Sequence, residues 1–304
     1  MKKLFWFIFG IIFIVFLVNL IGASFIYWRG GKDHYDVGDA NIGVIEVRGI
    51  ITDSMPVMEQ IRELDDHPQM KAVVVRIDSP GGAVGASQEI FWELRKLRSK
   101  MPVIVSMGNL AASGGLYVSL AGQHVFALPG TLTGSMGVIA SITNVARLLR
   151  KIYVDPVTIR SGPLKDAGNP LRPMDRKSKE YLQSMVNATF AQFKKDVQTE
   201  RKLSDAVIKK IGDGRVLNGS KALQIGLVNE IGSFNDAVDY AKKKANIEGK
   251  AKLAFLSRKP RSLLAKVIEG GLGNLVHQLN WDSESSGLYY LLSPAAKLAT
   301  EALH

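Results

Sequence analysis

The chain has 304 residues, of which 46% are hydrophobic and 22% are charged, so its composition allows a packed globular core. It contains no cysteine, which excludes disulfides, cysteine-ligated zinc sites, a thiol nucleophile and a lipid-bearing amino-terminal cysteine. The formal net charge is +11, but no nucleic-acid-binding signature accompanies the basic residues. We interpret clusters such as Arg172, Arg176, Lys177 and Lys179 as solvated surface, with anionic lipid as the alternative partner, and expect no nucleic acid to bind.

The amino-terminal segment, residues 1–28, is predicted to be a single-pass transmembrane anchor. Residues 4–28 are uncharged and mostly apolar, and about 20 such residues in a helix span a bilayer. A cleaved signal peptide is the alternative, but its apolar stretch is usually only about 7–15 residues long, and residues 21–23 match a cleavage site poorly. The flanking basic residues give only a slight preference for an inside amino terminus. Residues 29–41 are predicted to form a linker.

Residues 42–257 are predicted to form one α/β domain, because short β-branched runs alternate with amphipathic segments. The predicted strands are residues 42–47, 72–77, 103–107, 124–128, 137–142 and 154–160. The predicted helices are residues 55–64, 89–97 and 175–202, together with one that begins near Ser113. This repeated strand–helix order predicts a mainly parallel sheet covered by helices.

The carboxy-terminal tail, residues 258–304, has helical periodicity over residues 263–278, followed by a serine-rich break and the segment LYYLL. We expect a helix that packs on the domain. The alternative is that the tail approaches a neighbouring molecule or the substrate groove.

Three segments rich in glycine and serine follow predicted strands, at residues 78–82, 111–115 and 133–137. In an open parallel sheet, sites form at the carboxyl ends of the strands, where glycines let the backbone approach a substrate and direct N–H groups at an oxyanion. Ser113 has only alanine and glycine neighbours, and it lies where a helix is predicted to start. It is therefore a candidate nucleophile, and a helix N-cap serine is the structural alternative.

A serine nucleophile needs a base, and none of the five histidines lies in a glycine-rich turn. His124 is the only reasonable candidate for a Ser-His-Asp triad, which therefore has little support. Lys165 lies in the loop SGPLKDAG, directly after a predicted strand. A lysine acts as a general base once burial favours its neutral amine, whereas an arginine does not deprotonate. Ser135 would accept or relay a hydrogen bond from that amine, although simple solvent exposure is the usual state of a loop lysine.

Five motifs in order resemble the signal peptide peptidase A family in its short, single-unit bacterial form. They are IDSPGG at residues 77–82, AASGG at 111–115, PGTLTGSMGVI at 129–139, SGPLKDAGNP at 161–170 and GRVLNGSKALQIGLVNEIG at 214–232. The resemblance covers roughly residues 40–235. The separations also fit the family, because Lys165 follows Ser113 by 165 − 113 = 52 residues and Ser135 follows it by 135 − 113 = 22.

The resemblance implies a crotonase/ClpP-like α/β fold and a serine endopeptidase with a Ser–Lys dyad and no cofactor or metal. Ser113 is then the nucleophile, Lys165 the base and Ser135 the partner of the lysine, while the backbone N–H groups of Gly82 and Gly114 form the oxyanion hole. The family also implies a homo-oligomer whose dyads are shared between neighbouring protomers. Its members act outside the bacterial cytoplasmic membrane, where they degrade cleaved signal peptides and other unstructured membrane-proximal polypeptides.

Three other functions are compatible with parts of this pattern. A related membrane peptidase of the stomatin-linked kind would share the dyad and differ in its substrate pocket. A non-catalytic scaffold on the same fold would need neither Ser113 nor Lys165. A crotonase-type acyl-CoA enzyme would rely on carboxylate acids and bases beside the oxyanion glycines, where this chain offers a serine.

Overall fold

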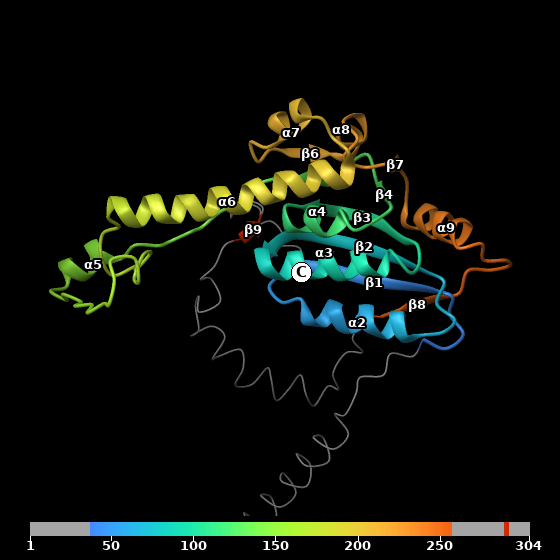
Figure 1. The fold of residues 1–304 in the computed structure, drawn as a ribbon, viewed down its shortest axis with the longest axis horizontal. Helices are drawn as coiled ribbons and strands as arrows, with labels where there is room; N and C mark the ends of the chain where they lie inside the picture. The colour runs from blue at the N-terminus through green and yellow to red at the C-terminus, as the bar shows by residue number, and fades with distance from the viewer. Residues whose placement is uncertain (1–36, 257–288, 292–304) are drawn as a thin grey trace, which may run out of the picture. The chain divides into compact units, whose positions relative to one another are not determined.

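The computed structural model describes residues 37–256 and 289–291, all of which belong to one of the two compact units of the chain (Figure 1). The predicted anchor at residues 4–28 and the predicted tail helix at residues 263–278 lie outside the described residues. Within the residues that the structure describes, no helix has both the length and the apolar character needed to cross a membrane.

The described part of the chain is built on a mixed sheet of nine strands in which parallel pairs predominate, as the sequence predicted. Its main path runs β6-β5-β3-β2-β1-β8, while β4 pairs with β3 and β7, and β9 pairs with β2. The strands are β1 (Ile42–Ile51), β2 (Ala72–Ala83), β3 (Val103–Ala112), β4 (His124–Ala127), β5 (Leu132–Gly134), β6 (Val216–Asn218), β7 (Glu230–Ile231), β8 (Leu253–Phe255) and β9 (Tyr289–Leu291). The antiparallel pairs are β5 with β6 and β2 with β9.

Helices cover both faces of this sheet (Figure 1). The helices are α2 (Met55–Asp66), α3 (Val84–Leu97), α4 (Gly114–Ser119), α5 (Ala146–Lys151), α6 (Arg176–Arg201), α7 (Asp205–Ile211), α8 (Gly219–Gln224) and α9 (Phe234–Lys244). The central strands β1, β2 and β3 are rich in valine and isoleucine and are buried on both faces, which is typical of parallel strands between two layers of helices. On one face, α9 completes a buried cluster with Ile42, Val74, Ile104 and Phe126.

The helix α6 was predicted from its polar, helical pattern, and the prediction is confirmed. Asp175 caps its amino terminus by accepting a hydrogen bond from the Ser178 N–H group at 2.8 Å. The helix has 26 residues, so it is about 39 Å long at a rise of about 1.5 Å per residue. Phe193 and Val197, near its carboxyl end, are buried in the core, whereas most of its earlier residues are exposed.

Two predicted strands, residues 137–142 and 154–160, are wrong. Residue 139 makes only an isolated bridge, and residues 154–160 pair with no strand in the part of the chain that the structure describes. Their β-branched side chains suggested buried strands, but Val157 is 87% exposed and Ile159 is 97% exposed. A β-branched segment forms a strand only where it finds a neighbouring strand and a surface to pack on. Neither segment finds both among the described residues.

Candidate active site

Ser113 occupies a sharp turn between the end of β3 and the start of α4. Its backbone has φ 53° and ψ −111°, a conformation that is costly for any residue with a side chain and is often found at functional sites. The residue is only 1% exposed. Ser113 holds the N-cap position of α4, but its side chain makes no capping hydrogen bond, and its Oγ has no hydrogen-bond partner among the described residues. Capping therefore does not account for this serine.

Ser135 lies beside this turn, because β3 and β5 are parallel neighbours that end together. Ala112 pairs with Gly134, and the Ser113 N–H group donates to the Gly134 carbonyl oxygen at 2.9 Å. Ser135 is 9% exposed and also has a positive φ, of 50°. The structure thus brings together two of the predicted site residues, both buried and both in unusual backbone conformations.

Gly82 and Gly114 also come together at this end of the sheet. A methyl group added to Gly114 would lie 3.0 Å from the Gly82 nitrogen and 2.6 Å from Ser87 Oγ. One added to Gly82 would lie 2.0 Å from the carbonyl oxygen of Ile51. Both positions therefore require glycine. The absence of a side chain at Gly114 lets its backbone approach the Gly82 nitrogen, and the absence of one at Gly82 lets β2 lie against Ile51.

A strand of the tail runs along the same part of β2. In β9, Tyr290 is the antiparallel partner of Gly82, within a register that spans Gly81 to Ala83. This finding favours the alternative in which the tail approaches the groove. It also shows that this part of β2 accepts an extended polypeptide strand next to Gly82.

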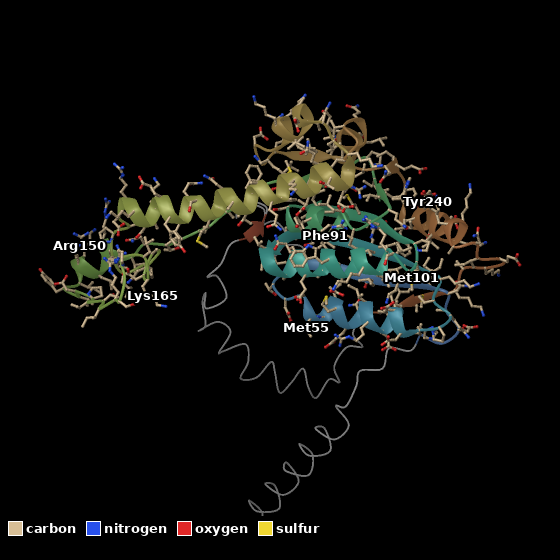
Figure 2. The ribbon with its side chains drawn as sticks, in the orientation of Figure 1. Met55, Phe91, Met101, Arg150, Lys165 and Tyr240 are labelled. Atoms are coloured by element: carbon tan, nitrogen blue, oxygen red, sulfur yellow. The ribbon has the colours of Figure 1, made fainter. Side chains whose placement is uncertain are left out.

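Lys165 is not near Ser113 within the chain. Its side chain is exposed, and Figure 2 shows it near Arg150, at the far end of α6 from Phe91. A methyl group on Gly168 in the same loop would lie 3.8 Å from Leu182 Cδ1, near the start of α6. The described part of the chain therefore does not supply the burial that was expected for this lysine.

The residue next to Lys165 fixes the loop that carries it. Asp166 accepts hydrogen bonds from Arg172 at 2.7 Å and from Arg160, and these two guanidinium groups lower the pKa of its carboxyl group. Arg172 also donates to Asp175, the N-cap residue of α6, at 2.9 Å. Arg172 was expected to belong to a solvated basic surface, and this role was missed, although the nearby acidic residues could have indicated it.

His124, the only histidine considered for a triad, lies at the other end of β3. It pairs with Ile104, eight residues before Ala112, which is about 26 Å at about 3.3 Å per residue. Its Nε2 atom lies 3.1 Å from the Glu230 carboxylate, and burial lowers the pKa of the imidazole more than Glu230 raises it. His124 therefore cannot serve as the base for Ser113 within the chain.

A cavity of about 850 Å³ opens beside Ser135. It lies between residues 136–142 and the exposed part of α6, and its lining is mainly apolar, including Met136, Val186 and Phe190. Among the described residues, no group of three or more histidine, aspartate or glutamate side chains is placed to hold a metal ion.

Comparison with known families places the chain among peptidases. The model of peptidase family S49 matches residues 95–248, which are 154 of the 304 residues. The chain belongs to peptidase family S49. The model of Clp protease also matches, over residues 41–136, which agrees with the strand–helix order of that region. The chain is thus an SppA-like serine peptidase with a ClpP-like α/β fold. The expected family, the expected enzyme class and the α/β part of the expected fold are confirmed.

Three relatives show how far this similarity extends. A protein of Synechocystis sp., named as a candidate protease, is 37% identical over 209 residues, which cover 68% of the S49 chain and 75% of the relative. An Enterococcus faecium protein, named as a candidate signal peptide peptidase SppA, is 34% identical, with 62% and 56% covered. The Arabidopsis thaliana protein named "Serine protease SPPA, chloroplastic" is 32% identical, with 79% and 37% covered. The matched region therefore covers only 56% of the Enterococcus faecium protein and 37% of the Arabidopsis thaliana protein.

Proposed function

We propose that the chain is a membrane-anchored serine endopeptidase with a Ser113–Lys165 dyad completed between neighbouring protomers. Its substrates are cleaved signal peptides and other unstructured polypeptides near the outer face of a bacterial cytoplasmic membrane, to which residues 4–28 anchor it. The observation that carries the proposal is the buried Ser113 hydroxyl, which has no hydrogen-bond partner in the described residues and sits on a strained turn. A buried hydroxyl without a partner is unfavourable unless it serves another purpose.

The separation of Lys165 from Ser113 supports a dyad made from two copies of the chain. The Lys165 loop contacts Leu182 through Gly168, whereas α4 contacts α6 at Asp196. These two points on α6 are 14 residues apart, or about 21 Å along the helix. An exposed amine is poorly suited to act as a base, so the neighbouring protomer has to cover it and remove it from water. We call α6 together with the Lys165 loop the α6 arm. In an oligomer whose α6 arm reaches the Ser113 turn of the next protomer, Lys165 would lie close to Ser113 and would be removed from water.

The chemistry then follows an acyl-enzyme path. Lys165 takes the proton of the Ser113 hydroxyl as Oγ attacks the substrate carbonyl carbon, and the backbone N–H groups of Gly82 and Gly114 stabilise the oxyanion. Collapse of this intermediate breaks the C–N bond, and the leaving amine takes the proton from Lys165. Lys165 next takes a proton from water as the water oxygen attacks the ester carbon. The ester C–O bond then breaks, which releases the second product, and Lys165 gives the proton to Ser113 Oγ. Ser135 accepts a hydrogen bond that holds the amine in place.

An extended polypeptide is the substrate form that this site suits. The antiparallel pairing of β9 with residues 81–83 supports this proposal, because a substrate strand could add to β2 in the same way. Strand addition needs an unfolded partner. The mainly apolar cavity beside Ser135 offers space for apolar side chains next to the cleavage point.

The decisive experiment is complementation between two inactive variants. Ser113→Ala and Lys165→Ala chains, co-expressed with different tags and purified together, are expected to recover about a quarter of wild-type peptide hydrolysis. With equal amounts of the two chains, random assembly places a Ser113 beside a neighbour's Lys165 in about a quarter of the sites. The matched control replaces the Ser113→Ala chain with one that carries both substitutions, and this mixture stays inactive.

A co-assembled mixture that shows no hydrolysis would rule out a dyad shared between protomers. Full activity of the Lys165→Ala chain alone would rule out the lysine base itself. Labelling of Ser113 by a fluorophosphonate, located by mass spectrometry, tests the nucleophile independently. A scaffold without activity gives no adduct.

A further inference from the structure

The helix that follows Ser113 is held against the carboxyl end of α6 by a group of polar contacts that we call the α4–α6 clamp. The clamp consists of Tyr117 on α4, Arg98 after α3, and Asp196, Glu200 and Arg201 on α6. These residues are distant in the sequence, and neither the motifs nor the catalytic steps described above use them.

Tyr117 provides the first contact, one helical turn after the nucleophile. Its N–H group donates to the Ser113 carbonyl oxygen at 2.9 Å, and its hydroxyl donates to the Asp196 carboxylate. The side chain is fully buried. Its ring lies edge-on to those of Phe91 and Phe193, with centroids 5.1 Å away in both cases, so the position of the hydroxyl is fixed by packing.

Two arginines provide the second contact, at the carbonyl groups that follow α4. Arg201 donates to the Gly122 oxygen at 2.9 Å, and Arg98 donates to the Ala121 oxygen at 3.2 Å. Arg98 also binds Glu200 at 3.0 Å. Burial lowers the pKa of Arg201 to about 10, so the guanidinium remains charged at neutral pH. Carbonyls at a helix end lack intrahelical partners, and here Arg201 on α6 and Arg98 just after α3 supply the donors.

The clamp lies at one end of α6, and Lys165 lies beyond the other end. Because the helix is about 39 Å long, a rotation of about 5° at the clamp moves the far end by roughly 3 Å. Displacements of about 1 Å are enough to lower catalytic rates about 100-fold. The direction of α6 at its base therefore determines whether the arm can deliver Lys165.

We infer that Tyr117, Asp196 and Arg201 are positioning residues that set the angle of the α6 arm against the nucleophile helix. This inference rests on the proposed Ser113–Lys165 dyad. In an oligomer, each clamp connects a protomer's own Ser113 turn to the arm that it extends to its neighbour. The clamp thus links consecutive active sites through rigid contacts within one chain.

The test is Tyr117→Phe, which removes one hydroxyl and keeps the ring packing. We expect kcat for peptide hydrolysis to fall about tenfold with KM unchanged, because the substrate strand binds to β2 and the arm acts on chemistry. The rate at which a fluorophosphonate labels Ser113 should fall by the same factor. In a Lys165→Ala background, Tyr117→Phe should cause no further loss of labelling, since a clamp that acts through Lys165 has nothing left to position.

Matched variants on α6 separate positioning from simple stability. Asp196→Asn keeps an acceptor for the Tyr117 hydroxyl, so its kcat should stay within about twofold of wild type, whereas Asp196→Ala should resemble Tyr117→Phe. Lys195→Ala, at an exposed neighbouring position, should change nothing. The Tyr117→Phe, Asp196→Ala double variant should be no slower than either single variant.

Two results would overturn the inference. One is an equal loss of labelling from Tyr117→Phe with and without Lys165, because the tyrosine would then act on Ser113 directly. The other is wild-type kcat in both Tyr117→Phe and Asp196→Ala, with only a lower thermal unfolding midpoint. Full activity of Lys165→Ala would instead refute the proposed dyad, and the clamp inference would fail with it. Failure of the clamp inference alone is recognised because Lys165→Ala is then inactive while Tyr117→Phe and Asp196→Ala keep the wild-type kcat, or because the loss of labelling in Tyr117→Phe does not depend on Lys165.

Discussion

The Ser113 turn and the Lys165 loop differ in almost every physical respect, although both are proposed to act in one reaction. The Ser113 turn is buried and joins two neighbouring parallel strands to a clamped helix. The Lys165 loop is exposed, has no regular strand or helix, and is held by the ion pairs of Asp166. The fold of one chain thus buries and orders the proposed nucleophile and oxyanion site, but leaves the proposed base, Lys165, exposed. If the dyad is completed between protomers as we propose, the separate chain would be inert and the assembled peptidase active.

The largest effect is expected at the preorganised end. Ser113→Ala should reduce hydrolysis about 10⁴-fold or more, yet it should not lower the free energy of unfolding. The Oγ atom has no hydrogen-bond partner among the described residues of its own chain, and removing a buried unpaired hydroxyl is expected to stabilise the fold by about 1 kcal/mol. Chemical denaturation of the variant beside wild type measures this difference.

Ser119→Ala is the matched control, because this serine lies on the same helix and is equally buried. Its Oγ donates to the Leu116 carbonyl oxygen at 2.6 Å, so its loss should destabilise the fold by about 1 kcal/mol. If Ser113→Ala were destabilised as much as Ser119→Ala, the unpaired state of the Ser113 hydroxyl would be refuted.

Lys165→Arg is expected to have the next largest effect, a loss of about 10³-fold in kcat. The variant keeps the positive charge, but its guanidinium does not accept a proton from Ser113. Because the Lys165 side chain is exposed in the chain, its thermal unfolding midpoint should match that of wild type. Retained hydrolysis in this variant would show that charge alone is required and would exclude the general-base role.

Gly114→Ala tests the oxyanion site and should reduce kcat about 100-fold. The added methyl group would lie 3.0 Å from the Gly82 nitrogen, so the two proposed donors must move apart. Gly85→Ala is the control, since nothing lies within 4 Å of its added methyl group. Wild-type kcat in Gly114→Ala would contradict the assignment of Gly82 and Gly114 to the oxyanion hole.

The difference between these two regions also explains what the sequence could predict. The strands at residues 42–47, 72–77 and 103–107 were predictable, because buried parallel strands require continuous β-branched runs. The meeting of Ser113, Ser135 and Gly82 followed from the same rule, since the ends of neighbouring parallel strands share one edge. Local patterns and topology were sufficient there.

The rest depends on contacts that no local pattern encodes. Residues 154–160 have a strand-like composition but find no partner strand among the described residues. The burial expected for Lys165 is likewise not provided by the part of the chain that the structure describes. Tyr117 and Asp196 are 79 residues apart in the sequence, and each one alone looks like an ordinary core tyrosine or surface acid. Only the packing of α6 on α4 reveals their connection.

The smallest effect is expected at the opposite end of β3 from Ser113, and it concerns stability rather than catalysis. Burial lowers the pKa of His124 in the folded state, so the unfolded chain binds a proton more readily than the folded chain between that lowered pKa and about 6.5. The free energy of unfolding therefore rises with pH through this window. The contribution of His124 to it is complete above about pH 6.5 and is partly lost as the pH falls below that value.

His124→Gln removes this contribution, so the free energy of unfolding, measured with urea at pH 7.5 and 5.5, should depend less on pH than in wild type. Glu230→Gln should make the contribution of His124 steeper, because Glu230 raises the pKa of the imidazole. Hydrolysis should be unchanged in His124→Gln, and a large loss of kcat there would restore the Ser-His-Asp triad as a competitor to the lysine base.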